Sequence, residues 1–201
     1  GRRYWLAIEV QPIRDESGKI TNFMAVERDI TAERAAQQRL GIQFEVSQQI
    51  AQYKSVDETL RGILQTVCHQ LGWPVGLLWR GYGQELRLID VELPKTAEWS
   101  EFREREKRNV LRWGDGLAGR VWKTNQSACI ADLEKETVST QTRSYMQAGL
   151  RGAIAFPILV RSDVWGVMEF CSQHVEPPDV ALLKTFLVVG NQLGQFIERS
   201  Q

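Results

Sequence analysis

The sequence lacks any excess of charge of one sign, because 25 lysines and arginines balance 25 aspartates and glutamates over 201 residues. A balanced chain has no net field that would draw it to nucleic acid or to anionic lipid. No apolar run comes close to the roughly 20 residues that span a bilayer, and no secretory hydrophobic segment opens the chain. We therefore expect a cytoplasmic protein that has neither a nucleic-acid nor a membrane partner.

Histidine and cysteine, which supply most metal ligands and many catalytic groups, are scarce. The three cysteines, Cys68, Cys129 and Cys171, lack metal-ligand spacing, and each lies in an apolar segment. Such cysteines are expected to be reduced and buried. His69 falls on the solvent side of a predicted helix, and His174 stands alone in a predicted loop. The sequence therefore predicts no metal site and no catalytic residue.

The most informative segment that is present is a glycine-rich turn at residues 113–122, with the sequence WGDGLAGRVW. Three glycines at spacings of two and three let the backbone turn tightly and let a helix begin close against a sheet. A phosphate-binding loop would place a lysine after its last glycine, but Arg120 and Val121 stand there. We interpret this segment as a structural turn.

The first thirty residues predict a β-hairpin. Residues 4–13 and 20–29 have the composition and alternation of strands, and residues 15–18 supply turn-forming side chains. An isolated two-stranded hairpin is marginally stable in water. Because the chain also begins within a strand-like pattern, we expect further structure upstream of this hairpin.

A long helix, a sheet and a final helix are predicted after the hairpin. Helix-forming composition runs from Thr31 to about Gln52, and a capping box of Ser55 and Glu58 begins a second helix. Strand patterns follow at residues 75–82, 86–93, 127–132, 152–161 and 164–172, and the last helix begins at residues 177–179. This order predicts an α+β fold with a central antiparallel sheet, a helical bundle on one face, and loops and short helices on the other.

The first and last helices each carry more apolar surface than one packed face requires. The last helix has two glycines one turn apart, which cost helix propensity and predict close approach by another backbone. We predict a helix bundle, doubled across a two-fold axis in a homodimer, formed by Leu40, Phe44, Ser47, Ala51, Leu187, Gly190 and Gly194. The small Ser47 and Ala51 are expected to meet the glycines. The alternative is that the glycines relieve crowding against the sheet.

The glycine-rich segment 113–122 and the order of elements from Phe44 to Arg199 resemble GAF domains, small sensory modules whose sheet holds a ligand pocket under a variable lid. The hairpin, which ends in Asp29-Ile30-Thr31 and passes into a helix, resembles the C-terminal end of a PAS domain. These resemblances imply three segments: residues 1–30 as the PAS hairpin, residues 31–53 as a connecting signalling helix, and residues 54–201 as the GAF domain.

The resemblance to GAF domains implies a small-molecule pocket, whose ligand the sequence leaves unknown. Aromatic and hydrogen-bonding residues of the variable segments are the candidates to line it, namely Trp79, Trp113, Tyr145 and Met146. The alternative is that each belongs to the core, because large aromatic side chains dominate core burial. The mixed-charge segment 98–108 is expected to be a solvated helix with local ion pairs and is a candidate lid.

Bilin-binding GAF domains attach a tetrapyrrole to a cysteine shortly before a helix that leads into a central strand. Residues 141–146 occupy that place here and contain no cysteine. Helical geometry puts Cys68 at the edge of a buried face and His69 in solvent, so this pair is expected to be structural. The resemblance therefore argues against a covalently bound bilin, with Cys129 left open as an attachment point. Asn125 and Gln126 also lack the pattern of cyclic-nucleotide-binding relatives.

The resemblance implies a sensory or regulatory part of a multidomain bacterial signal-transduction protein, commonly a histidine kinase of a two-component system. It implies no enzyme activity within these residues. Two alternatives stay open: a bilin-linked photosensor, and a ligandless dimerisation spacer or regulator of a cyclic-dinucleotide enzyme. In the hypothesis of a sensory domain, binding of a ligand or a signal from upstream alters the helix bundle of a homodimer.

Overall fold

The computed structural model describes residues 4–52, 55–137, 139–175, 177 and 179–200. It divides into two compact units, Gly1–Leu40 and Gly41–Gln201, and we describe each by itself. The predicted start of the last helix at residues 177–179 falls partly on Pro178, which lies outside the described residues.

The smaller unit contains the predicted hairpin. Strands β1 (Leu6–Arg14) and β2 (Ile20–Asp29) pair in antiparallel fashion, and Asp15 accepts hydrogen bonds from the backbone N–H groups of Ser17 and Lys19 in the turn. Nearly all residues of both strands are exposed, including large apolar side chains. Helix α1 (Thr31–Ala51) begins in this unit, where its Thr31 Oγ1 accepts from the backbone N–H of Trp5 at 2.8 Å. The predicted hairpin and long helix are therefore present.

The larger unit is built on a six-stranded antiparallel sheet with the order β5-β4-β3-β8-β7-β6. Its strands are β3 (Val75–Tyr82), β4 (Glu85–Glu92), β5 (Val110–Arg112), β6 (Ala128–Ile130), β7 (Gly152–Val160) and β8 (Asp163–Ser172). The sequence analysis missed β5, because three residues are too few to show alternation. The other five strands are confirmed within a few residues of their predicted ends.

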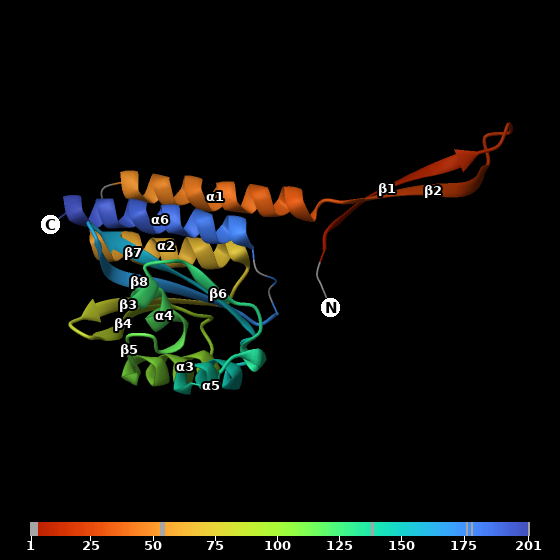
Figure 1. The fold of residues 1–201 in the computed structure, drawn as a ribbon. Coiled ribbons are helices and arrows are strands. Elements are labelled where there is room, and N and C mark those ends of the chain that lie inside the picture. The colour runs from red at the N-terminus through yellow and green to blue at the C-terminus, as the bar shows by residue number, and fades with distance from the viewer. Residues whose placement is uncertain (1–3, 53–54, 138, 176, 178, 201) are drawn as a thin grey trace. The chain divides into compact units, whose positions relative to one another are not determined.

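Helices cover both faces of this sheet (Figure 1). One face carries α2 (Val56–Leu71), α6 (Val180–Arg199) and residues 41–51 of α1. The other carries α3 (Ala97–Arg108), α4 (Gly116–Thr124), the 3₁₀ turn η1 (Leu133–Lys135) and α5 (Thr140–Gln147). Ser55 and Glu58 form the predicted capping box of α2. The predicted α+β plan is therefore confirmed.

Two buried clusters lie on opposite faces of the sheet. Under α2 and α6 the core is apolar, and its centre is a stack of Phe156, Phe170 and Phe186, with ring centroids 4.8 to 6.1 Å apart. Under α3, α4 and α5 the core contains aromatic side chains that carry polar groups, among them Trp79 and Tyr145. The second cluster therefore combines apolar packing with buried hydrogen-bonding groups from several elements.

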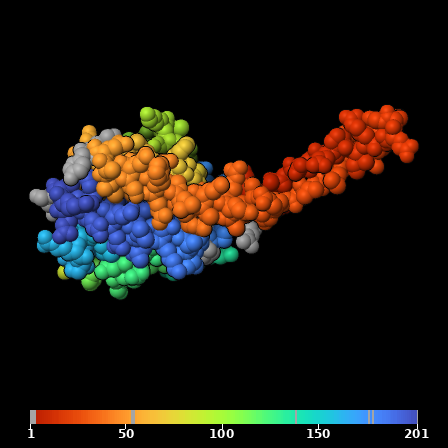
Figure 2. Space-filling view, turned by 90° about the horizontal axis from the view of Figure 1, so that it is seen from above, coloured from red at the N-terminus to blue at the C-terminus, as the bar shows by residue number. Residues whose placement is uncertain are grey.

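Gly190 and Gly194 meet the sheet, which corrects the predicted contact with Ser47 and Ala51 of α1. A Cβ atom at Gly190 would overlap the carbonyl oxygen of Pro157, and one at Gly194 would overlap that of Leu159, both on β7. Ser47 and Ala51 are instead exposed. The sequence correctly predicted a close backbone approach but named the wrong partner, and the alternative of crowding against the sheet holds. Figure 2 shows residues 41–51 of α1 beside α6 at the surface of the larger unit.

Helix α6 is also long and apolar enough to cross a membrane by length and composition alone. Half of the apolar window is buried inside the larger unit, where Phe186, Val189 and Leu193 pack in the core under the sheet. A core helix of a globular domain passes the same test, so its hydropathy is accounted for by packing.

Replacing Gly194 with alanine tests the contact between α6 and β7. We expect Gly194→Ala to lower the free energy of unfolding by about 2 kcal/mol or more, because the added methyl group collides with backbone that cannot rotate away. Urea unfolding followed by circular dichroism measures the change.

The matched control is Gly41→Ala, where the new Cβ atom would lie 3.2 Å from the flexible amide end of Gln70. The control should be neutral or up to about 1 kcal/mol stabilising, from helix propensity alone. If both variants unfold at the same urea concentration as the wild type, the close contact with β7 is absent.

Candidate functional site

The glycine-rich turn brings α4 close to the sheet, as predicted. Asp115 accepts a hydrogen bond from the backbone N–H of Arg112 at 3.0 Å, and α4 begins at the next residue. A Cβ atom at Gly119 would lie 2.5 Å from the carbonyl oxygen of Arg112. A side chain at this position would therefore push the helix away from the turn.

Gly116 makes room for a side chain from a distant part of the sequence. Its φ of +58° is rarely adopted by other residues, and a Cβ atom there would overlap Oε1 of Gln141 on α5. Gln141 is 3 % exposed, and its Nε2 donates to Oη of Tyr145 at 2.8 Å and to Oε2 of Glu169 at 3.3 Å. The turn thus helps to hold Gln141 against the sheet.

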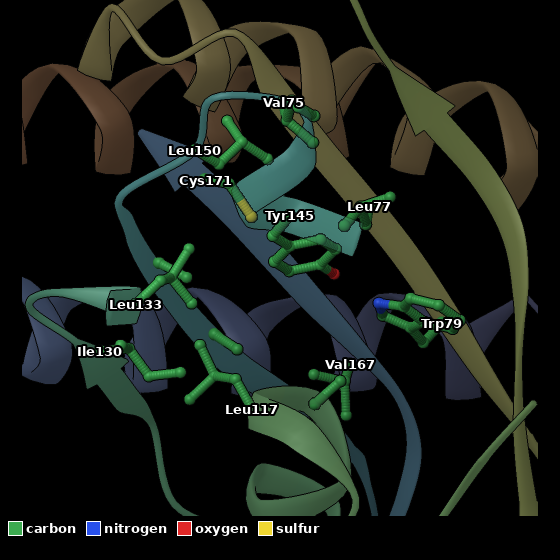
Figure 3. Close-up of a cluster of buried hydrophobic side chains, with 14 of the residues drawn as sticks. Val75, Leu77, Trp79, Leu117, Ile130, Leu133, Tyr145, Leu150, Val167 and Cys171 are labelled. Atoms are coloured by element: carbon green, nitrogen blue, oxygen red, sulfur yellow. The ribbon is translucent and has the colours of Figure 1, made fainter. Parts of the chain in front are cut away.

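Glu169 on β8 is the centre of this site and is fully buried. Its Oε2 accepts hydrogen bonds from Nε1 of Trp79 at 3.0 Å and from Oη of Tyr145 at 3.0 Å, besides the bond from Gln141. Its Oε1 is buried and has no hydrogen-bond partner in the part of the chain that the structure describes. Figure 3 shows the polar atoms of Trp79 and Tyr145 pointing toward each other on the same face of the sheet.

Burial dominates the electrostatics of this cluster. Removal from water raises the pKa of Glu169 to about 7, and the hydrogen bonds from Tyr145 and Trp79 only partly offset that rise. Burial, with the nearby carboxylate of Glu169, also raises the pKa of Tyr145 well above its usual value. The tyrosine is therefore a neutral donor at physiological pH.

A second buried carboxylate, Glu106 on α3, lies on the outer side of α5. It accepts hydrogen bonds from Ser144 Oγ and from Asn109 Nδ2, and Arg105 Nε donates to Ser144 Oγ at 2.7 Å. Burial raises the pKa of Glu106. Together with Gln141 and Tyr145, these contacts place α5 between two buried acids.

The burial of Glu106 corrects the prediction that the mixed-charge helix is solvated. Trp99, Phe102 and Glu106 are all less than a tenth exposed, so one face of α3 packs against the core. Their spacing of three and then four residues places them on one helical face. That spacing was the signal in the sequence, and the alternating charges around it masked it.

Two of the four predicted pocket residues meet in this cluster. Trp79 and Tyr145 both bind Glu169, and Met146 is partly buried against the same core. Trp113 lies apart, 65 % exposed and packed edge-on against Trp122. The sequence analysis missed Glu169, although a single acidic residue inside the apolar strand pattern of residues 164–172 was a signal for it.

The predicted helix-surface residues lie where solvent can reach them. Leu40 and Phe44 are 66 % and 63 % exposed, Ser47 and Ala51 are also exposed, and Leu187 is half-buried. The two glycines of that set, Gly190 and Gly194, are buried against β7.

The cysteines and histidines follow the sequence analysis closely. Cys68 and Cys171 are buried thiols, and Cys129 on β6 is half-buried, which raises its pKa. His69 is exposed, as its helical position predicted. Among the described residues, no group of His, Cys, Asp and Glu side chains is arranged to hold a metal ion.

A surface pocket of about 380 Å³ lies between α2, β4 and α3. It is crossed by the ion pair of Arg61 and Asp90, whose Nε and Oδ2 atoms are 2.9 Å apart. Arg103, Lys107 and Glu92 also line it, so the pocket has mixed charge and favours neither sign.

A family model described as "GAF domain" matches residues 54–198. A comparison with curated protein sequences finds no match. Solved structures share the fold at low identity. The NLH2 GAF domain of A. aeolicus in an inactive state is 19 % identical with a TM-score of 0.65, over 83 % of this chain and 99 % of its own.

Two other solved structures hold small molecules. The free methionine-R-sulfoxide reductase of Neisseria meningitidis, in complex with its substrate, is 16 % identical with a TM-score of 0.67, over 83 % of this chain and 92 % of its own. The phycocyanobilin-bound GAF domain of a cyanobacterial phytochrome is 12 % identical with a TM-score of 0.63, over 81 % of this chain and 94 % of its own. At these identities the likeness concerns the fold alone.

The raised pKa of Glu169 predicts how stability depends on pH. A carboxyl group whose folded pKa exceeds its unfolded value of about 4.5 contributes stability below that value and loses it as pH rises through about 7. The free energy of unfolding should therefore fall between about pH 5 and about pH 8, by up to about 3 kcal/mol from this group.

Urea unfolding of Glu169→Gln at both pH values checks this, because the amide does not titrate and the fall should shrink. The other titratable groups that influence Glu169 are Tyr145, Glu106 and Cys171. Glu106 also has a raised pKa, so the variant Glu106→Gln measures how much of the pH dependence of the unfolding free energy comes from Glu106. An equal fall in wild type and Glu169→Gln would contradict the assignment.

Proposed function

This chain belongs to the GAF domain family, and we propose that it is the sensory and regulatory part of a multidomain bacterial signal-transduction protein. The observation that carries this proposal is the buried carboxylate of Glu169, one oxygen of which has no partner among the described residues. An apolar side chain at this position would avoid the cost of burying an unpaired polar atom. The unpaired oxygen therefore favours a binding site, because it adds nothing to the stability that the three hydrogen bonds of Oε2 give the cluster.

We propose that a small molecule binds on the α3, α4 and α5 side of the sheet. Trp79 and Tyr145 would contact it, with Met146 at the side of the cluster. The reductase structure with its substrate and the phytochrome domain with its bilin support this, because the same fold accommodates small molecules in both. Within these residues we propose no enzyme activity.

The helices on the opposite face are the proposed output. Phe44, Ser47 and Ala51 form an exposed stripe of α1, which Leu40 continues, and α6 exposes Val188 and part of Leu187 beside it. Exposed apolar residues on two neighbouring helices support a homodimer that is joined through this face. The dimer would hold a downstream domain, for which we propose a histidine kinase.

The hairpin is proposed to be the end of a PAS domain that signals into α1. Its exposed apolar side chains, such as Ile8, Val10 and Phe23, support this, because a two-stranded sheet cannot cover them by itself. Signals from the hairpin side and from a ligand would then converge on α1 and α6.

Two alternatives have specific support. Trp79 and Tyr145 are fully buried and fill the core, which favours a ligandless dimerisation spacer. The bilin-bound neighbours favour a photosensor, but α5 contains no cysteine and Cys129 is only half-exposed to solvent. A visible absorbance band after expression with bilin would support the photosensor.

A thermal-shift screen of nucleotides, tetrapyrroles and metabolites tests ligand binding. A true ligand at 100 times its Kd should add about 2.7 kcal/mol of stability and raise the Tm accordingly. Trp79→Phe, which removes the Nε1 donor, should weaken binding, whereas the exposed control Trp113→Phe should not. If no compound binds, or if the compounds that bind do so equally well to Trp79→Phe, the ligandless dimerisation spacer is favoured.

Sedimentation equilibrium tests the homodimer. We expect Phe44→Glu to weaken dimerisation by about tenfold or more, because it places a charge in the apolar stripe of α1. The control Val110→Glu changes a 44 % exposed residue on β5, away from these helices, and should leave the dimer unchanged. If the wild-type protein is a monomer, the proposed signalling through a homodimer of α1 and α6 is rejected.

A further inference from the structure

We propose that Glu169 binds the positively charged nitrogen of a small organic cation of the alkylammonium class, on the α3, α4 and α5 side of the sheet. This inference rests on the proposed function and names the chemistry of its ligand.

The hydrogen bonds of Glu169 are unevenly distributed. Three donors, from Trp79, Tyr145 and Gln141, converge on Oε2, while Oε1 is buried without a donor among the described residues. A carboxylate can accept about four hydrogen bonds, and none of these three reaches Oε1. An ammonium group has three donors and no acceptor, and is therefore the complement of such an oxygen.

The charges around Glu169 also favour a cation as its ligand. The carboxylate of Glu106 on α3 raises the pKa of Glu169, whereas Tyr145 and Cys171 stay neutral because their own pKa values are raised. A ligand that brings a further negative charge is therefore disfavoured here. The nearby guanidinium of Arg105 is directed at Ser144, beside Glu106. No ion pair to Glu169 occurs among the described residues, so an ionised Glu169 lacks a counter-charge.

Aromatic rings supply the remainder of a cation site. Trp79, Phe102 and Tyr145 are at most 2 % exposed, and the rings of Phe102 and Tyr145 are 5.9 Å apart. The guanidinium carbon of Arg105 already lies 5.7 Å from the Phe102 ring centroid. Aromatic faces attract cations more strongly when water is excluded, but they offer no such gain to an anion or an alcohol.

Binding at Glu169 is coupled to the position of α5. Gln141 and Tyr145, both on α5, donate to Oε2 of the carboxylate whose Oε1 the ammonium group would bind, so the ligand and α5 share Glu169. Because Trp79 and Tyr145 fill the site, a ligand enters as α5 moves away from β8. Ser144 links the same helix to Glu106 and Arg105 of α3, so the displacement reaches α3 as well.

Isothermal titration of the whole chain with butylammonium chloride tests this inference, with butanol and sodium butyrate as matched neutral and anionic probes. We expect butylammonium alone to bind. Glu169→Gln should weaken binding by about tenfold or more, since it removes the charge and keeps the shape. The control Glu98→Gln removes an exposed carboxylate of α3 and should leave the affinity unchanged.

Two further measurements separate recognition from folding. Binding to the ionised carboxylate should release protons near pH 7, which appears as a dependence of the measured heat on the ionisation enthalpy of the buffer. Tyr145→Phe removes one donor to Oε2 and keeps the ring, so less of the carboxylate's charge is compensated within the protein and butylammonium should bind about threefold more tightly or better. This second variant remains informative if Glu169→Gln does not fold.

The outcomes distinguish this inference from the proposed function. Equal binding of butylammonium and butanol, full affinity in Glu169→Gln, or no gain in Tyr145→Phe each overturns the cation site. If butylammonium fails while a neutral or anionic metabolite from the thermal-shift screen binds and depends on Trp79, the sensory function stands and the ligand class is wrong. If nothing binds, both are rejected.

Discussion

The structure of the larger unit depends on one buried carboxylate. Glu169 joins Trp79 of β3 with Gln141 and Tyr145 of α5, residues that lie far apart in the sequence. In an apolar core each of these hydrogen bonds is strengthened, and leaving one unmade is costly. The same physics makes the site responsive, because the oxygen without a partner gives the carboxylate an interaction still to gain.

The two faces of the sheet differ in packing and, under the proposed function, in their role. The face toward α2 and α6 is apolar and packed closely enough that Gly190 and Gly194 of α6 lie directly against β7. At these two glycines no side chain separates the helix from β7, and β7 is paired along its length with β8, which carries Glu169. Under the proposed function, a change at Glu169 therefore reaches α6 through closely packed backbone.

Much of the fold could be predicted because its signals are local. The turn at residues 15–18, the capping box of Ser55 and Glu58, and strand alternation all act within a few residues of the chain. Half of the site followed from residue type, since Trp79 and Tyr145 are amphipathic aromatics that need a buried polar partner. Glu169, Glu106 and Gln141 escaped prediction, because their importance depends on which distant groups they meet.

The sequence by itself determined the order and type of the elements and the close backbone approach at the two glycines of α6. Propensity, capping and glycine geometry are properties of short segments, so they can be read without a partner. Only the tertiary structure decided that this approach is to β7, that Trp113 lies outside the polar cluster, and that one oxygen of Glu169 has no partner among the described residues. Burial and hydrogen-bond pairing are set by segments far apart in the chain, and no local pattern records them.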